Sequence, residues 1–167
     1  MELPKRKHPR LKQYNYASTG AYFVTICTEN RKPMLSRISV GRGLAPAELH
    51  LTELGCVAEE QLRELETRYD SVVVDKYVIM PNHIHILLLF RGETAGPRPR
   101  PTLMDVICAY KSLTTRFCKR LESFAGRKVF QTSFYEHVIR SEAEHLEIWR
   151  YIDDNPAKWT EDEFYTP

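Results

Sequence analysis

The sequence predicts a single domain of the α+β class, built on a mostly antiparallel sheet with helices packed mainly on one face. Two observations lead to this prediction. The chain has 167 residues, of which 43% are hydrophobic, and this suits one domain with a substantial core. Its periodic segments follow one another in the order strand, helix, strand, strand, helix, strand, with a further helix at the end. We therefore expect residues 1–167 to form one structural unit.

The first part of the chain predicts a basic arm, a strand and a helix. Residues 1–19 are polar and rich in cations, whereas residues 20–28 alternate β-forming side chains as a strand does. Residues 36–51 contain glycines and a proline, and they predict at most a short strand near their end. Thr52 suits the N-cap of a helix that continues to about residue 69.

Two adjacent strands follow, at residues 71–80 and 83–91, joined by a tight turn that contains a proline. The second strand is the most apolar of the chain, yet it begins with His83 and His85. Successive strand residues point to opposite faces, so these two imidazoles project side by side. They could be ordinary polar residues at a strand end, but an imidazole pair also suits a divalent metal ion.

A proline- and glycine-rich loop at residues 92–101 precedes the second helix. Thr102 and Asp105 predict the start of that helix. Its expected buried stripe consists of Leu103, Val106, Ile107, Tyr110, Leu113, Phe117 and Leu121. The side chains expected off the stripe, and therefore available to a partner, are Lys111, Thr114, Thr115 and Arg116.

The last part of the chain predicts a strand and a third helix. Residues 133–139 have the composition of a strand, and Ser141 with Glu144 forms a capping-box pattern at the start of the helix. Pro156 disfavours helical geometry in the residue before it, so the helix should end near Asn155.

Charge and cysteine content restrict the functional classes. The formal net charge of +2 is too small to indicate a nucleic-acid binder, but the cations are clustered. The candidate phosphate contacts are Lys5, Arg6, Lys7, Arg10, Arg98, Arg100, Lys111 and Arg116, although such runs can also be solvated surface. Four scattered cysteines, with no apolar membrane span or signal segment, predict a cytoplasmic protein whose thiols are reduced core residues.

Five segments together resemble one protein family. Pro81-Asn82-His83-Ile84-His85 is similar to the signature of the HUH single-strand DNA nucleases. The whole chain is most similar to their IS200-like single-tyrosine transposases, and especially to the REP-associated tyrosine transposases. The further matching segments are GAYFVTICT (20–28), YKSLTTR (110–116), FYEHVIR (134–140) and YIDDNP (151–156). In order and spacing these segments cover roughly residues 8–160.

The resemblance implies a ferredoxin-like sheet with the histidine pair on a central strand, and a nucleophilic tyrosine on a following helix. Tyr151 falls on that position, and Asn155, four residues later, falls on the position of a third metal ligand beside His83 and His85. A spacing of four places Tyr151 and Asn155 on one helical face. The implied cofactor is a divalent ion, Mg²⁺ or Mn²⁺, and the implied product is a 5′-phosphotyrosine with a free 3′-OH.

The resemblance also implies partners and supporting residues. Single-stranded DNA hairpins are the expected substrate, with no membrane association, in the cytoplasm at the nucleoid. The family includes dimers that exchange the tyrosine helix and monomers, so a monomer and a homodimer are both open. Glu136 and His137 are similar to residues that border the family's site, although the residues favour an ordinary polar strand face slightly over a direct catalytic role; Arg140 is a further candidate for supporting the site. Tyr110 is expected in the core, and Tyr135 could support the site.

Two other functions remain open from the residues. The first is a hairpin DNA- or RNA-binding module on the same scaffold that does not cut its ligand. The second is a metal hydrolase that uses His83 and His85 with water as the nucleophile, in which case changing Tyr151 to phenylalanine leaves the activity intact.

Overall fold

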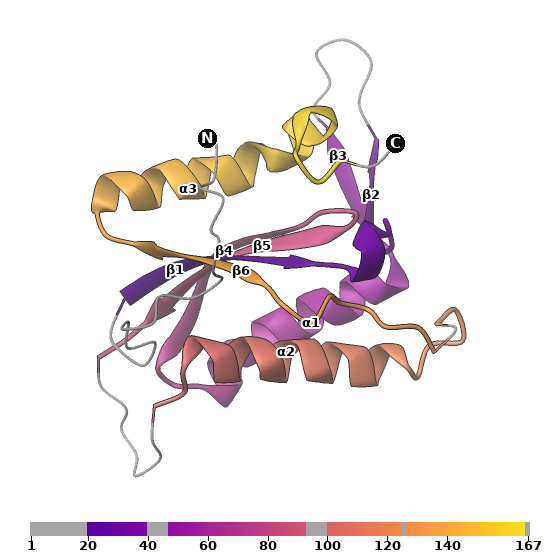
Figure 1. Cartoon of the computed structure of the whole chain (residues 1–167), viewed down its shortest axis with the longest axis horizontal. Coiled ribbons are helices and arrows are strands. Elements are labelled where there is room, and N and C mark those ends of the chain that lie inside the picture. The colour runs from indigo at the N-terminus through magenta and orange to yellow at the C-terminus, as the bar shows by residue number, and fades with distance from the viewer. Residues whose placement is uncertain (1–19, 40–46, 93–99, 125, 166–167) are drawn as a thin grey trace.

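Four antiparallel strands form the central sheet, in the order β4, β5, β1, β6 (Figure 1). The computed structural model describes residues 20–39, 47–92, 100–124 and 126–165. The sheet consists of β1 (Gly20–Cys27), β4 (Val72–Ile79), β5 (His83–Phe90) and β6 (Tyr135–Ile139), and a separate hairpin pairs β2 (Ser36–Ser39) with β3 (Glu48–Leu51). The helices are α1 (Glu53–Arg68), α2 (Leu103–Cys118) and α3 (Glu142–Asp154), with 3-10 turns η1 (Glu29–Arg31) and η2 (Asn155–Glu161).

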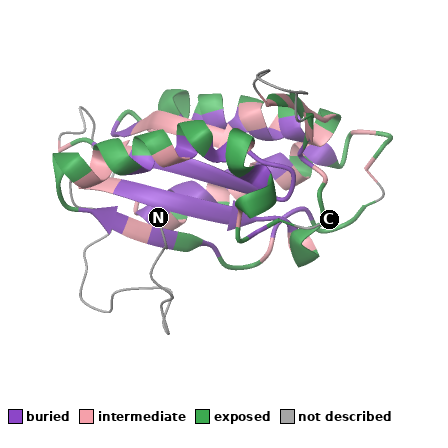
Figure 2. Ribbon diagram, turned by 90° about the horizontal axis from the view of Figure 1, so that it is seen from above, coloured by how far each residue is buried: buried purple, intermediate pink, exposed green. Residues whose placement is uncertain are grey.

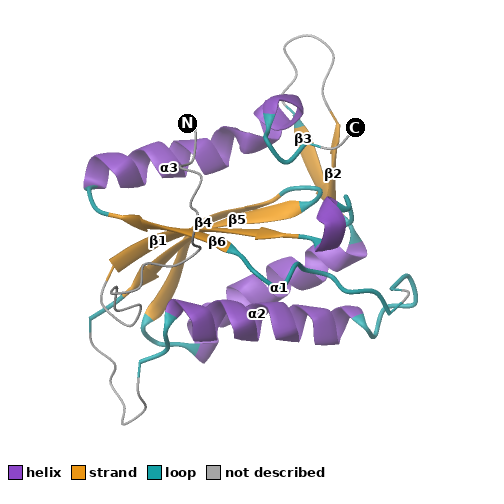
Figure 3. Ribbon diagram, in the orientation of Figure 1, coloured by secondary structure: helices purple, strands orange, loops and turns teal. Residues whose placement is uncertain are grey.

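The order of elements and of strands is ferredoxin-like. Apart from the β2–β3 hairpin, the chain runs β1, α1, β4, β5, α2, β6, and each strand of the sheet is antiparallel to its neighbours. Helices α1 and α2 lie on one face of the sheet, and α3 lies on the other (Figure 3). The predicted α+β class, the antiparallel sheet and the placement of most helices on one face are confirmed.

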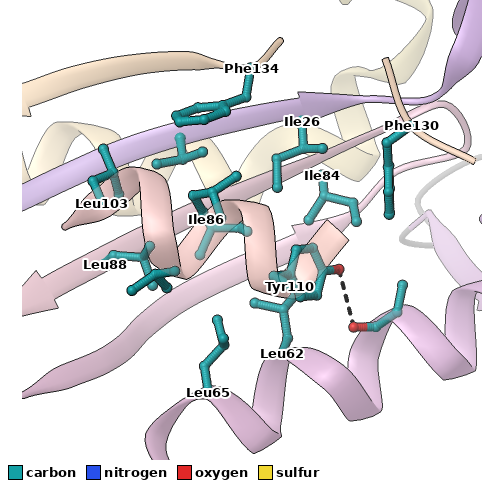
Figure 4. Packing of buried hydrophobic residues seen from close by; sticks show 14 of the residues in the cluster. Ile26, Leu62, Leu65, Ile84, Ile86, Leu88, Leu103, Tyr110, Phe130 and Phe134 are labelled. Atoms are coloured by element: carbon teal, nitrogen blue, oxygen red, sulfur yellow. Dashed lines mark hydrogen bonds between the residues drawn. The ribbon is translucent and has the colours of Figure 1, made fainter. Parts of the chain in front are cut away.

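The face of the sheet toward α1 and α2 forms the main hydrophobic core. Val24 of β1 lies opposite Ile86 of β5, and both side chains are fully buried in this core. Tyr110 of α2, which we expected in the core, donates its hydroxyl to the Ala58 carbonyl of α1 at 3.1 Å and so joins the two helices (Figure 4). The two inner strands of the sheet, β1 and β5, are accordingly mostly buried, while the outer sides of the helices are exposed (Figure 2).

A smaller apolar cluster holds α3 on the opposite face. Phe23 of β1 and Leu87 of β5 lie opposite each other in the sheet, and Ile148 and Ile152 of α3 pack against them. Residues four apart share a helical face, so this pair aligns α3 along the sheet. The same face of the sheet carries the histidine pair, because the strand alternation separates it from the core face.

The three predicted helix starts are confirmed. The hydroxyl of Thr52, Thr102 or Ser141 accepts a hydrogen bond from the backbone N–H three residues later in each helix. The Glu144 carboxylate, expected to complete the capping box of α3, instead accepts from the Arg140 N–H one residue before the cap, at 2.8 Å. Helix α3 ends at Asp154, as the following proline predicts.

The predicted buried stripe of α2 is wrong in its second half. Thr114 and Cys118 are fully buried, whereas Leu113 and Phe117 are only partly buried. Thr114 was expected to be available to a partner, but it follows Tyr110 by one helical turn and therefore points into the core. The prediction rests on the apolar character of Leu113 and Phe117, but the smaller side chains of Thr114 and Cys118 occupy the buried positions.

The prediction that the cysteines are core residues is right for two of the four. All four cysteines are free, but only Cys27 and Cys118 are buried; Cys56 and Cys108 are exposed and so are not core residues. Within the described part of the chain, no helix has the length and apolar character needed to cross a membrane.

Gly55 marks a close approach between α1 and the chain that follows η1. The Leu35 carbonyl accepts hydrogen bonds from both the backbone N–H and the hydroxyl of Thr52, which pulls this strand of backbone onto the first turn of α1. A Cβ on Gly55 would lie 1.9 Å from the Leu35 oxygen. Only glycine fits this contact without a backbone shift.

Replacing Gly55 by alanine should therefore destabilise the protein, by roughly 1–3 kcal/mol as at other overpacked sites. A decrease in the free energy of unfolding would be informative, because alanine is otherwise favoured over glycine inside a helix by about 1 kcal/mol. The measurement is the free energy of unfolding in urea. Glu60→Ala, on the exposed side of the same helix, is the control and should stay within about 0.5 kcal/mol of wild type. A Gly55→Ala protein as stable as wild type would contradict the close contact.

Candidate metal and nucleophile site

His83 and His85 stand side by side at the start of β5, on the face covered by α3 and the C-terminal segment. The register places His83 opposite Cys27 and His85 opposite Thr25 of β1. Both imidazoles are fully buried, and their ring centroids are 4.5 Å apart. The predicted side-by-side projection is confirmed.

Asn82 determines which nitrogen of His83 is free. The Asn82 amide nitrogen donates to the carbonyls of Phe164, at 2.6 Å, and Arg31, at 3.3 Å, so the amide oxygen is the atom that faces His83. That oxygen lies 2.9 Å from His83 Nδ1 and can only accept, so Nδ1 carries the proton. The lone pair is consequently on Nε2, which is buried and has no hydrogen-bond partner.

Thr25 is the hydrogen-bond partner of the corresponding ring nitrogen of His85. Its hydroxyl lies 2.8 Å from His85 Nδ1, leaving Nε2 directed toward the Tyr151 hydroxyl at 3.5 Å. Burial lowers the pKa of His85 to about 3, and burial together with the neighbouring His85 lowers the pKa of His83 well below its usual range. Both imidazoles are therefore neutral at physiological pH, which is the form that binds metals.

Tyr151 and Asn155 approach the pair from α3. The Tyr151 ring lies 5.3 Å from the His85 ring and packs edge-on against Phe23. Asn155 is buried, its Oδ1 has no hydrogen-bond partner, and its amide is close enough to raise the pKa of His83 and lower that of Tyr151. The fold thus brings together the four residues that the sequence predicts as nucleophile and metal ligands, namely His83, His85, Tyr151 and Asn155.

The Tyr151 phenol is protonated in this environment. Burial is the main cause that raises its pKa to about 12, and the carboxylates of Asp162 and Glu163 add to the effect. A phenol in this state is a weak nucleophile unless a nearby cation or base assists it.

Asp162 belongs to the same cluster, and the sequence did not reveal it. One nitrogen of each histidine and one Asp162 oxygen lie within 4.8 Å of one another, and His83 Nε2 is 4.0 Å from Asp162 Oδ2. The carboxylate also accepts from the Phe164 N–H at 2.7 Å and from the Asn155 amide at 3.1 Å. No local signal distinguishes Asp162 from the acidic residues on either side of it, Glu161 and Glu163.

The segment after η2 covers the histidine pair. The Phe164 ring lies 4.6 Å from the His83 ring, and the Trp159 ring lies 6.0 Å from it. On the outer side, the Arg31 guanidinium stacks over Phe164 at 5.0 Å. Phe164 and Trp159 therefore contribute to the burial of the His83 ring.

No family model matches the chain. A solved structure of a REP-associated tyrosine transposase bound to a REP hairpin superposes with a TM-score of 0.62 and 17% sequence identity, over 89% of this chain and 73% of that one. The chain has the fold of a REP-associated tyrosine transposase. An uncharacterised protein of Haemophilus influenzae is 29% identical over 96% of this chain and 93% of its own length.

The residues predicted to support the site occupy different positions in this fold. Glu136 pairs with Val24 in the register, so its side chain lies on the core face of the sheet and not on the face of the histidines. His137 is on the correct face, but it pairs with Glu144 and so ties β6 to the start of α3. Arg140 contributes its backbone N–H to the same carboxylate. Tyr135 is largely exposed on the edge strand.

The predicted phosphate contacts are divided between described and undescribed parts. Those that lie outside the described residues, in the basic arm and the loop at 92–101, are Lys5, Arg6, Lys7, Arg10 and Arg98. Arg100 and Arg116 are exposed. The Lys111 ammonium instead bonds to the carbonyls of Gln131 and Thr132, at 2.6 and 2.8 Å. Helix α2 also lies on the opposite face of the sheet from α3 (Figure 1), so Lys111 and Arg116 remain predicted contacts at a distance from the site.

The buried neutral histidines predict loss of stability in acid. An unfolded chain protonates His85 near the ordinary pKa of 6.5, whereas the folded protein resists protonation down to about 3. Below pH 6.5 the unfolded state therefore binds more protons, and the free energy of unfolding must fall as the pH decreases through this window. Urea unfolding in EDTA at about pH 7 and about pH 5 measures the slope. His85→Asn cannot titrate and should reduce that slope; equal slopes in the two proteins would exclude His85 as its source.

Proposed function

We propose that the protein is a metal-dependent single-strand DNA endonuclease and strand transferase that acts on hairpin DNA through a covalent bond to Tyr151. The observation that carries the proposal is the approach of the Tyr151 hydroxyl, at 3.5 Å, to His85 Nε2 beside a second neutral imidazole. Support also comes from the fold, which is shared with a transposase that was solved on a REP hairpin. The fold alone assigns no chemistry, so the argument depends on the site.

The residues present fit a divalent cation. His83 Nε2 and Asn155 Oδ1 are buried and have no hydrogen-bond partner, and orphaned polar atoms are costly unless an ion or water satisfies them. We infer that His83, His85 and Asn155 hold Mg²⁺ or Mn²⁺ there. When bound, the cation neutralises charge on the scissile phosphate and on the approaching phenol oxygen.

The chain's own residues then supply the nucleophile and its position. Helix α3 presents the Tyr151 oxygen, which forms a bond to phosphorus while the bond from phosphorus to the 3′ oxygen breaks. The phenol loses its proton to water, and the departing 3′ oxygen gains one. One phosphoester replaces another, so the 3′-OH can later attack the phosphotyrosine and rejoin a strand, which a hydrolytic product would not permit.

The decisive experiment follows covalent attachment. With Mn²⁺ and a labelled single-stranded oligonucleotide that folds into an imperfect hairpin, wild type should form an adduct with the fragment downstream of the nick that survives denaturation. Tyr151→Phe removes only the hydroxyl, so the adduct and the nick should both fall to background while hairpin binding persists. Tyr69→Phe, at the end of α1 on the other face of the sheet, is the matched control and should react as wild type does.

The same gel separates the alternative functions. A Tyr151→Phe protein that still nicks the hairpin would identify water as the nucleophile and favour the hydrolase. A wild-type protein that binds several hairpins but never attaches to one would favour the binding module.

Metal dependence is tested on His83. His83→Ala should abolish cleavage and leave hairpin affinity nearly unchanged, because the imidazole serves the transition state more than the grip on the phosphate backbone. His50→Ala, an exposed histidine of β3, is the control for the loss of an imidazole. Cleavage rates and hairpin affinities of the three proteins are the measurement. Equal cleavage in EDTA and in Mn²⁺ would exclude the metal mechanism.

A further inference from the structure

The C-terminal segment carries a buried carboxylate into the histidine site. The Asp162 side chain is only 2% exposed, although its neighbours Glu161 and Glu163 are both exposed. A carboxylate at this depth is costly unless it is paired with a cation or is well hydrogen-bonded. Its two hydrogen bonds, from the Phe164 N–H and the Asn155 amide, satisfy only part of its capacity, since each carboxylate oxygen can accept two.

The position of Asp162 is fixed from several sides. The Asn82 amide nitrogen holds the Phe164 carbonyl, while the oxygen of the same amide orients His83. The Phe164 ring contacts both the Arg31 guanidinium and the His83 ring. The Asn82 amide therefore fixes both the tautomer of His83 and the position of Phe164. Through these two contacts it positions the His83 imidazole and the Asp162 carboxylate.

We propose that Asp162 is a carboxylate ligand of the same cation as His83, His85 and Asn155, so that metal binding fastens residues 159–165 over the site. The inference rests on the proposed function for the presence of the cation. Two ligands on one ion lie at most about 4.2 Å apart, given bonds of about 2.1 Å, and the His83 and Asp162 atoms are separated by 4.0 Å. The other pairs of ligand atoms in the cluster lie within 4.8 Å of each other, so they need to approach only slightly to share one ion.

Asp162 would contribute a negative charge that the other three proposed ligands lack. The two imidazoles and the Asn155 amide are neutral, so Asp162 is the one anionic donor among these four ligands and would supply much of the attraction for a divalent ion. A six-coordinate ion with four protein donors would retain about two positions for oxygen atoms of the phosphate. The carboxylate can therefore hold the cation without excluding the substrate from it.

Calorimetric titration with MnCl₂ tests the proposal without reference to activity. Asp162→Asn removes the charge but keeps an oxygen that can accept from the Phe164 N–H. Its affinity for Mn²⁺ should fall at least about tenfold, because even groups that only orient a ligand contribute that much. Glu163→Gln removes the same charge one residue away, from an exposed side chain, and should bind Mn²⁺ as wild type does.

A second measurement detects the fastening of the segment. Hydrogen exchange of the backbone in residues 159–165 should slow on addition of Mn²⁺ in wild type and in Glu163→Gln, and should remain unchanged in Asp162→Asn. Unfolding in urea checks that the two variants are folded. Support requires both the loss of affinity and the loss of protection in Asp162→Asn.

The outcomes separate this inference from the proposed function. If Asp162→Asn binds Mn²⁺ as tightly as wild type while His83→Ala does not bind it, Asp162 is not a ligand, and the nuclease proposal is unaffected. If wild type itself shows no Mn²⁺ binding and no Mn²⁺-dependent protection, both this inference and the metal-dependent function fail. A loss of affinity that is equal in Asp162→Asn and Glu163→Gln would reduce Asp162 to a general charge effect and overturn the inference.

Discussion

The turn between β4 and β5 is the constraint on which the site depends. Its Pro81 carbonyl accepts from the backbone N–H groups of Met34 and Leu35, and its Asn82 carbonyl accepts from the N–H and hydroxyl of Thr28. These bonds join the turn to the chain after β1, and the Asn82 side chain then orients His83 and holds Phe164. Replacing Asn82 would therefore disturb three features together: the tautomer of His83, the path of the chain after β1, and the position of Phe164 over the site.

The two faces of the sheet differ in role: one forms most of the hydrophobic core, and the other carries the candidate site. The side toward α1 and α2 is filled with apolar residues and accounts for most of the core. The side toward α3 accepts His83, His85, Thr25 and Asn155 in buried positions, where polar groups are tolerated only because they pair with one another or with a ligand. Two buried side-chain atoms without a hydrogen-bond partner, His83 Nε2 and Asn155 Oδ1, lie there, as expected of a site that is completed by something other than protein.

Helix α3 is held in place by polar ties as well as by its apolar stripe. His145 bonds to Asp75, and Lys76 pairs with Asp153 and lies over the Trp149 ring. Asp75 is the residue skipped in the register between Val74 and Lys76, and such a bulge allows two consecutive side chains of β4 to contact α3. These contacts, with the bond between His137 and Glu144, set the position of the Tyr151 hydroxyl against His85.

Local patterns in the sequence determined the elements and the paired residues. Threonine and serine caps locate the helix starts, strand alternation places His83 beside His85, and helical spacing places Tyr151 above Asn155, because each relation spans only a few residues. Only the tertiary structure decided which distant groups meet. Glu136 faces the core because of its pairing with β1, Thr114 is buried where α2 meets the sheet, and Asp162 reaches His83 through a segment whose path depends on Asn82 and Arg31. Such contacts join residues far apart in the chain, and no short-range periodicity or capping preference encodes them.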